Sequence, residues 1–88
     1  MSKENWIPCK ERYPEMHLLS EWSNCKEYDS DLCLVQTSKH GMFIAECIKT
    51  VGKDFISYEW FSYGTGGRRM KVKSKVIAWM PLPEEYVE

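Results

Sequence analysis

The sequence has no long apolar run. A helix needs roughly 20 consecutive apolar residues to cross a bilayer, and polar or charged residues interrupt every apolar stretch of this chain before that length. The N-terminus also lacks the apolar segment of a secretion signal. We therefore expect a soluble, cytoplasmic protein that does not bind a membrane. Its 88 residues predict a single domain, residues 1–88, with one modest core.

The cysteines lack the spacing that a zinc site needs. Zinc-binding turns usually present two ligands from one C-x₂₋₄-C pair, and no such pair occurs among Cys9, Cys25, Cys33 and Cys47. Without a secretion signal, reduced thiols are favoured over disulfides. Cys33 and Cys47 fall within expected strands, so we expect packed, unreactive thiols there. A disulfide or a metal site stays as the alternative.

The chain is also poor in groups that carry out catalysis. His17 and His40 are its two imidazoles, and both fall in expected loops or turns. They are extra candidates for metal ligands, or for the base of a cysteine nucleophile, but no spacing specifies either role. Glu46 and Glu59 can face each other across a hairpin as paired carboxylates, although a lone Glu on a strand usually faces water. We predict no enzyme activity, no metal and no cofactor.

What the sequence does have is β-branched and aromatic residues in short runs. Glycine-centred turns separate the runs, a pattern typical of consecutive antiparallel strands. We predict an all-β fold of five or six strands, in a single small antiparallel sheet that curls into an open barrel. The expected strands are residues 5–8, 32–37, 42–51, 55–63, 70–74 and 76–80.

Prolines and polar residues mark where these strands stop. Pro81 and Pro83 cannot donate to a sheet ladder, so the last strand leaves as extended chain. Near the other end, Pro14 and the spacing of the apolar residues after it predict a short helical turn near residues 15–22. The polar stretch 20–31 is expected to be a loop.

Three motifs stand at the start, in the middle and at the end of the chain. They are N-W-I-P-x-K-E-R-Y-P-E at residues 5–15, D-L-C-L-V-Q at 31–36 and V-I-A-W-M-P-L-P-E at 76–84. Together they resemble a bacterial and phage domain of unknown function, number five hundred and fifty-one in its series, whose members begin W-I-x-V-x-x-R-L-P and end V-T-H-W-M-P-L-P. Pro8 stands where that family usually has Val, and Ala78 where it usually has His.

The resemblance implies a small β-rich domain found in phage, prophage and bacterial genomes, with no enzyme activity attached to it. The signature residues in this chain are Trp6, Pro14, Trp79, Pro81 and Pro83. We expect the two indoles to pack together with Pro14 and Pro81, which would join both ends of the chain to one core. A ligand pocket between the Trp and Pro residues is the alternative.

The net charge of −1 hides a separation of charge along the chain. Residues 1–31 hold four cations against seven anions, a net −3, whereas residues 32–80 hold eight cations against three anions, a net +5. Residues 84–88 then add an acidic tail. This asymmetry predicts one basic and one acidic surface.

Five of the eight cations in residues 32–80 stand in one glycine-rich stretch before the last strand. Exposed amides of its turn can form an anion nest, and arginine binds phosphate or carboxylate bidentately. Aromatic rings of the preceding strand can offer stacking faces. A solvated hairpin whose lysines discourage edge pairing is the simpler alternative. The candidate binding residues are Trp60, Tyr63, Gly66, Gly67, Arg68, Arg69, Lys71 and Lys73, with Tyr58 and Lys75 beside them.

We therefore expect a small, non-catalytic binding module of the phage-accessory kind that the resemblance implies. Its basic, aromatic face would dock onto an acidic surface of a partner protein, for instance to block a host or defence protein. The alternative is a module that sequesters a small anionic ligand such as a nucleotide, or binds nucleic acid, at the glycine-rich turn. The many aromatic residues can also leave an apolar patch outside, which would favour a homodimer.

Overall fold

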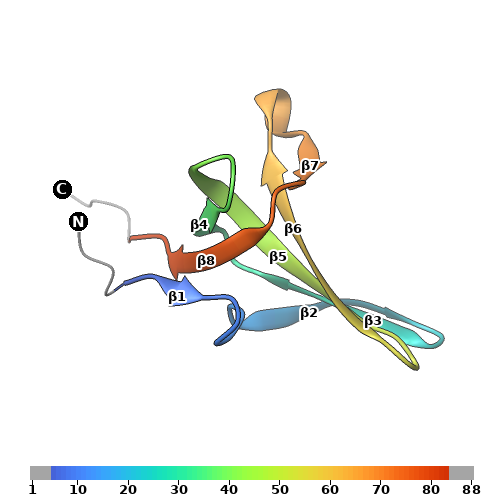
Figure 1. The fold of residues 1–88 in the computed structure, drawn as a ribbon. Helices are drawn as coiled ribbons and strands as arrows, with labels where there is room; N and C mark the ends of the chain where they lie inside the picture. Colours follow the sequence, from blue (N-terminus) through green and yellow to red (C-terminus); the bar gives the residue numbers. More distant parts are fainter. Residues whose placement is uncertain (1–4, 84–88) are drawn as a thin grey trace.

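The computed structural model describes residues 5–83 and contains eight β-strands joined by short turns (Figure 1). All neighbouring strands pair in antiparallel fashion, so the predicted all-β antiparallel fold is confirmed. The strands are β1 (Ile7–Pro8), β2 (Met16–Trp22), β3 (Cys25–Ser30), β4 (Cys33–Thr37), β5 (Met42–Val51), β6 (Ile56–Tyr63), β7 (Arg69–Lys71) and β8 (Val76–Pro81). Within residues 5–83 the only helical segment is the 3₁₀ turn η1 (Thr65–Gly67), and no helix there is long and apolar enough to cross a membrane.

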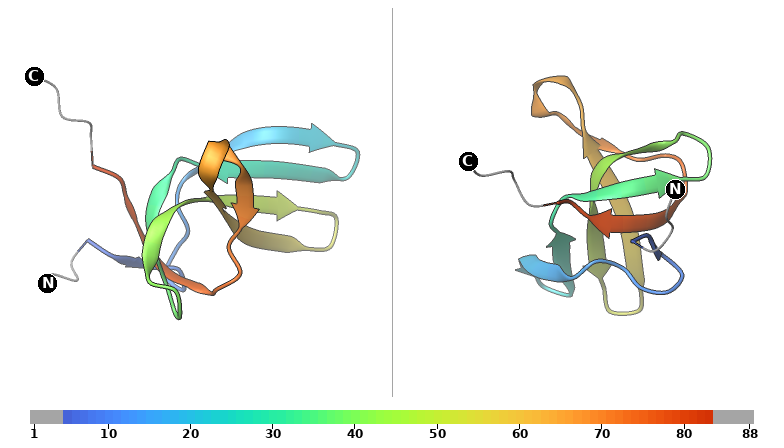
Figure 2. Two further views of the ribbon diagram at one scale, coloured as in Figure 1. Left: turned by 90° about the horizontal axis from the view of Figure 1, so that it is seen from above. Right: turned by 90° about the vertical axis from the view of Figure 1, so that its left-hand side faces the viewer.

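The sheet is organised around β5, the longest strand. Residues 42–45 of β5 pair with β4, and residues 48–51 pair with β3 further along the same edge. β6 runs along the opposite edge with β7 beyond it, while β8 and β1 extend the sheet past β4. The result is one curled sheet that stays open, as expected (Figure 2). It has eight strands rather than the expected five or six, since the polar segment before β4 also forms two strands, β2 and β3.

That polar hairpin follows the first turn of the chain. Residues 15–22, predicted as a helical turn, lie almost entirely in β2, and residues 20–31, predicted as a loop, hold the end of β2, a tight turn and β3. Trp22 stands opposite Cys25 across the turn. A helix this short is marginal in water, whereas β3 pairs with β2 on one side and with β5 on the other. Pairing with the rest of the sheet therefore overrides the local preference.

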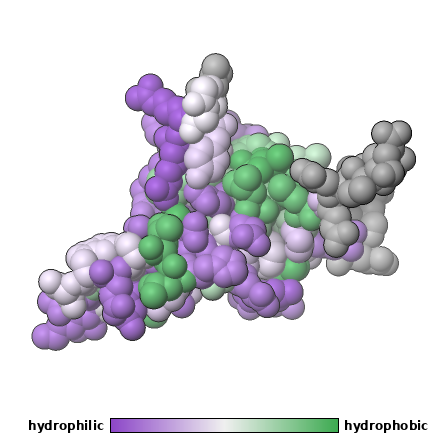
Figure 3. Space-filling model, turned by 180° about the vertical axis from the view of Figure 1, so that it is seen from behind, coloured by the Kyte–Doolittle hydropathy of each residue, from purple (hydrophilic) through white to green (hydrophobic). Residues whose placement is uncertain are grey.

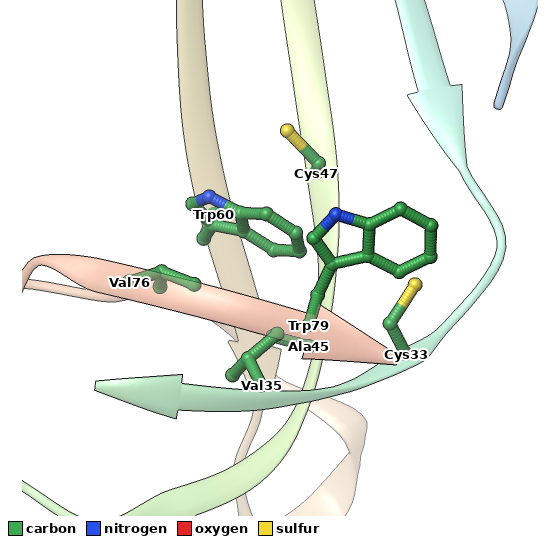
Figure 4. Close-up of a cluster of buried hydrophobic side chains, with 7 residues drawn as sticks. All are labelled: Cys33, Val35, Ala45, Cys47, Trp60, Val76 and Trp79. Carbon is green, nitrogen blue, oxygen red and sulfur yellow. The ribbon is translucent and has the colours of Figure 1, made fainter. Parts of the chain in front are cut away.

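The core lies between β4, β5, β6 and β8, where seven buried side chains form one cluster (Figure 4). Trp60 and Trp79 supply the largest side chains, and the thiols of Cys33 and Cys47 point into the same interior. Both thiols are buried, so the expectation of packed side chains at these two positions is confirmed. Ala45 and Cys47 share the inward face of β5, as the alternation of a strand requires.

The two ends of the described chain meet, although not through two indoles. β1 pairs with β8, and Ile7 stands opposite Trp79. Trp79 is buried and donates its indole N–H to the Arg12 carbonyl oxygen at 2.9 Å. Ile7 packs against the core, whereas Trp6 is half-buried and precedes the strand. The prolines of the signature differ in burial, with Pro14 buried and with Pro81 and Pro83 exposed.

Two projections leave this body. The first, which we call the arm, comprises β2, β3 and the adjoining halves of β5 and β6, and it extends to the lower right in Figure 1. The second, which we call the cationic hairpin, comprises residues 61–75 and rises at the top of Figure 1. The two regions begin at opposite ends of β6. The expected acidic tail, residues 84–88, lies outside the described residues.

Candidate functional site

The glycine-rich turn of the cationic hairpin is closed by its own backbone. Gly64 donates its N–H to the Arg68 carbonyl oxygen at 2.7 Å, and Gly67 donates its N–H to the Gly64 carbonyl oxygen at 3.0 Å. Gly66 and Gly67 both have a φ of +76°, a left-handed conformation that residues with a Cβ adopt only at a cost. Two amides that an anion nest would use are therefore already bonded within the turn. The turn offers an anion fewer donors than the sequence predicts.

The basic side chains of this hairpin all lie at the surface. The Arg69 guanidinium lies 4.1 Å from the centroid of the Phe61 ring, and Lys71 forms an ion pair with the Glu59 carboxylate. Among the ion pairs found within residues 5–83, this is the one to which the cationic hairpin contributes. Most of its positive charge is therefore open to a partner. The exposed cations are Arg68, Arg69, Lys71, Lys73 and Lys75.

The aromatic residues of the expected site separate in the structure. Trp60 is only 8% exposed and belongs to the core, so its inclusion among the binding residues is wrong. Tyr63 is 47% exposed and donates its hydroxyl hydrogen to the Glu46 carboxylate. This hydrogen bond raises the pKa of Tyr63, because the bond is made by the neutral phenol. The cationic hairpin therefore keeps one exposed tyrosine, at the end of β6 next to the glycine-rich turn.

The groups considered for thiol catalysis lie apart. His40 is exposed and its Nδ1 contacts the Ser74 hydroxyl, whereas Cys33 and Cys47 are buried. Burial raises the pKa of Cys47 to about 12, and it also raises the pKa of Cys33. A nucleophilic cysteine needs the opposite shift, since only the thiolate attacks. The structure therefore does not assemble a cysteine nucleophile from these residues.

The carboxylates and the remaining histidine are also dispersed. Glu46 stands opposite Phe61 and Glu59 opposite Ile48, so the two carboxylates lie on the same face of the sheet as diagonal neighbours and are not directly opposed. His17 Nε2 lies 3.7 Å from an Asp31 carboxylate oxygen, and both side chains are exposed. Within the part of the chain that the structure describes, no three His, Cys, Asp or Glu side chains are grouped to hold a metal ion, and each cysteine is a free thiol.

A pocket of about 470 Å³ lies where β1 and the turn after it meet β8. The signature residues Pro14, Trp79 and Pro81 are among its walls, so the alternative of a pocket between Trp and Pro residues has a structural counterpart. The Arg12 guanidinium lies 5.4 Å from the centroid of the Trp79 ring system. Besides its apolar walls, this pocket is lined by Arg12, by the His17 imidazole and by the carboxylates of Glu15 and Asp31, so its charges are of both signs.

A second pocket, of about 460 Å³, lies at the base of the arm. Its walls include Arg12, Tyr13, Tyr28, Lys49 and Tyr58, and we call it the tyrosine pocket. Sequence reasoning named only Tyr58 among these residues, because the others come from the first turn and from two other strands. Residues 25–30, which hold Tyr28, show no apolar and polar alternation and were interpreted as part of a loop.

Exposed apolar residues also gather on the body, as the space-filling view of one face shows (Figure 3). On the outer side of β5, Met42 and Ile44 are 55% and 48% exposed, and Ile44 stands opposite Leu34 of β4. An apolar area of this kind is where the expected homodimer contact would form. That a second copy of the chain covers this area stays a prediction.

The comparisons with known proteins give no relative for this chain. No family model, curated protein or solved structure matches it. The positions and chemistry of its own side chains are therefore the basis for inferring what the chain binds. The resemblance carried by its terminal motifs stays an expectation.

Proposed function

We propose that this chain is a small, non-catalytic binding module of the cytoplasm, of the phage-accessory kind that its terminal motifs resemble. Its cationic hairpin docks onto an acidic surface of a partner protein, such as a host or defence protein, and thereby blocks or tethers that partner. The observation that carries the proposal is a projecting hairpin with five exposed cations, of which Lys71 alone has a carboxylate partner in the described structure.

The shape of the hairpin supports docking to a large surface. It projects from the body on β6 and β7 (Figures 1 and 2), and hydrophilic side chains cover one side of the projection at the top of the space-filling view (Figure 3). A convex, charged projection suits a protein surface, where complementary charge steers association and sets specificity. The Phe61 ring beneath Arg69 restrains that guanidinium, so less side-chain entropy is lost when it meets a carboxylate.

The same cations have a simpler structural role that the test must separate. β7 is an edge strand, and lysines on an edge strand discourage pairing with another chain. That role requires charge on the edge but no acidic partner. Charge reversal therefore distinguishes the two roles, because a docking surface loses its partner whereas a protected edge stays protected by charge of either sign.

The test is the double substitution Arg68→Glu with Arg69→Glu, measured by fluorescence anisotropy with a labelled poly-glutamate peptide. The matched control is Lys10→Glu with Lys53→Glu, which makes the same change in net charge at exposed positions outside the hairpin. We expect wild type and control to bind and the hairpin variant to lose binding. Equal binding by the hairpin variant, or an equal loss in the control, would overturn the proposal. A pull-down from bacterial lysate with the same three proteins then identifies the partner.

A further inference from the structure

The inner face of the arm continues the core surface outward along the strands. Cys47 stands opposite Trp60, and both belong to the core. Two residues further out, Lys49 stands between Tyr28 of β3 and Tyr58 of β6. Residues two apart on a strand face the same side, so the row of Tyr28, Lys49 and Tyr58 is the first row of this face beyond the closed core.

Tyr13 turns this row into a pocket. Its ring stacks on the Tyr58 ring with the centroids 3.8 Å apart and the planes 2° from parallel, and it lies 6.5 Å from the Trp60 ring. The next residue, Pro14, is buried and restrains the backbone beside this ring. The tyrosine pocket of about 460 Å³ is left between Tyr13 and Tyr58 on one side and Tyr28 on the other. Its volume lies within the range of roughly 300–1,000 Å³ that small-molecule sites occupy.

The charges of this pocket are of one sign. Its walls hold Arg12 and Lys49 and, among the described residues, no carboxylate. Lys49 Nζ lies 5.7 Å from the centroid of the Tyr28 ring and 5.9 Å from that of Tyr58, while Arg12 lies over Trp79. Neither cation takes part in an ion pair within residues 5–83. Ring faces hold a cation in place without cancelling its charge, so both charges remain available to an anion.

The hydroxyl groups add donors to the charges. A tyrosine phenol keeps its proton near neutral pH and can donate to a phosphate oxygen, and burial raises the pKa of Tyr13 further. Lys49 lies over two of the pocket's rings, and Arg12, whose guanidinium lies over the adjacent Trp79, is a second cation in its wall. Flat aromatic walls with cations beside them match a ligand that joins a flat ring to an anionic group. A bare phosphate would leave the ring faces unused, and a neutral aromatic compound would leave the cations without a partner.

We propose that the tyrosine pocket binds a nucleotide, with the base against the tyrosine rings and the phosphate between Arg12 and Lys49. This site lies at the end of β6 opposite the cationic hairpin. It goes beyond the docking function proposed above and does not depend on it. Stacking on a tyrosine face accepts any base, so the pocket selects a phosphorylated nucleoside as a class.

The first experiment separates the two halves of the ligand. Thermal shift and calorimetric titration are run with ATP and AMP, with adenosine as a base without phosphate, and with tripolyphosphate as phosphate without a base. We expect the nucleotides to raise the melting temperature, because they bind the native state only. The affinities of adenosine and of tripolyphosphate should each be lower than that of ATP by about tenfold or more. No shift at millimolar nucleotide, or tripolyphosphate binding as tightly as ATP, would overturn the proposal.

The second experiment locates the site. Lys49→Met keeps the apolar stem between the two rings and removes the charge, and we expect about a tenfold weaker affinity for ATP. Lys53→Met makes the same change at an exposed position in the turn that follows β5 and should bind as wild type does. Equal ATP affinity in Lys49→Met would overturn the assignment.

A measurement on the wild-type protein covers the case in which Lys49→Met does not fold. In amide NMR spectra with ATP, we expect the largest shifts at Tyr28, Lys49 and Tyr58. Shifts centred on residues 64–71 would place the ligand on the cationic hairpin and overturn the pocket. Because Arg68→Glu with Arg69→Glu leaves the tyrosine pocket intact, that variant should bind ATP normally, so failure of the docking function and failure of this site give different results.

Discussion

The two cationic regions of this molecule are assembled differently. The cationic hairpin takes its charge from residues close in the sequence that stand exposed on and beside an edge strand. The tyrosine pocket takes its charge from Arg12 and Lys49, which are distant in the sequence and lie over aromatic rings. The hairpin has more charge, but the pocket holds its charge in a concavity with aromatic walls. A fixed position and a concave shape, more than the amount of charge, suit a region to a small ligand.

One strand contributes to both regions and to the core between them. Along β6, Tyr58 lines the tyrosine pocket, Trp60 is buried in the core, and Tyr63 is exposed next to the glycine-rich turn of the cationic hairpin. Three large aromatic residues on one strand therefore have three different environments. Each also has a different partner on an adjacent strand: Tyr58 stands opposite Lys49, Trp60 opposite Cys47 and Tyr63 opposite Arg69.

The largest effect on this comparison is expected from Trp79→Ala. Trp79 is 4% exposed, holds the Arg12 carbonyl through its indole N–H and lies beneath the Arg12 guanidinium. Truncating a buried Trp costs about 3–5 kcal/mol of unfolding free energy, which urea denaturation measures. The control Trp22→Ala removes an indole that is 48% exposed and should cost about 1 kcal/mol or less.

Trp79→Phe sharpens the same comparison in a folded protein. It keeps a ring beneath Arg12 but removes the indole N–H that fixes the first turn of the chain. We expect weaker ATP binding and unchanged poly-glutamate binding, because the cationic hairpin makes no use of Trp79. A parallel loss of both activities would show that the two regions are not independent.

The strands after residue 31 were predictable because local signals agree there. Gly41 ends the turn before β5 with a φ of +71°, which a glycine supplies readily. Val35 and Ala45 alternate with partly exposed or exposed neighbours, as strands with one buried face require. Sequence and sheet therefore agree from β4 to β8, except that the strand expected at residues 70–74 is the shorter β7, Arg69–Lys71.

The segment before residue 31 was not predictable in this way. Within β2 and β3, Leu18, Leu19 and Trp22 are exposed and much of the rest is polar, so no alternation marks a buried face. β3 is fixed by β5, a partner distant in the sequence. The tyrosine pocket was missed for the same reason, since the register alone brings Tyr28 beside Lys49. The cationic hairpin was found because its charge is local.

High pH should lower the free energy of unfolding through Cys47, a buried residue next to the tyrosine pocket. Cys47 precedes Lys49 on the inner face of β5, and burial raises the pKa of its thiol from 9.0 to about 12. Above pH 9 the unfolded chain loses this proton and the folded chain keeps it, so stability is full below pH 9 and declines toward pH 12. The slope for one such group is roughly 1.4 kcal/mol per pH unit.

The control for this prediction is Cys47→Ala, which removes the titrating group. Urea unfolding at pH 8 and at pH 10 should show wild type more stable than the variant at the lower pH, with a smaller difference at the higher pH. Other groups titrate in both proteins and cancel in the difference. A difference that stays constant between the two pH values would contradict a buried, protonated thiol at this position.

Salt should separate the two regions by a smaller amount. Raising the ionic strength from about 0.1 M to about 1 M shortens the Debye length from about 10 Å to about 3 Å. The exposed cations of the hairpin are screened fully, so we expect poly-glutamate binding to weaken about tenfold or more. Lys49 is half-buried between rings, and stacking does not depend on salt, so ATP affinity should fall less. An equal fall in both would mean that the pocket binds by charge alone.

The smallest effect is expected from Glu59→Gln, which releases Lys71 from its carboxylate partner. An exposed ion pair contributes about 0–1 kcal/mol, so the unfolding free energy should change by no more than that. Poly-glutamate affinity should rise slightly, because the fifth cation of the hairpin is then open. Glu21→Gln is the matched control: it removes an equal charge from a pair with Lys26 on the arm, where the distance is 3.6 Å. If both variants raise the affinity equally, the gain comes from net charge, and the position of Lys71 on the hairpin has no part in docking.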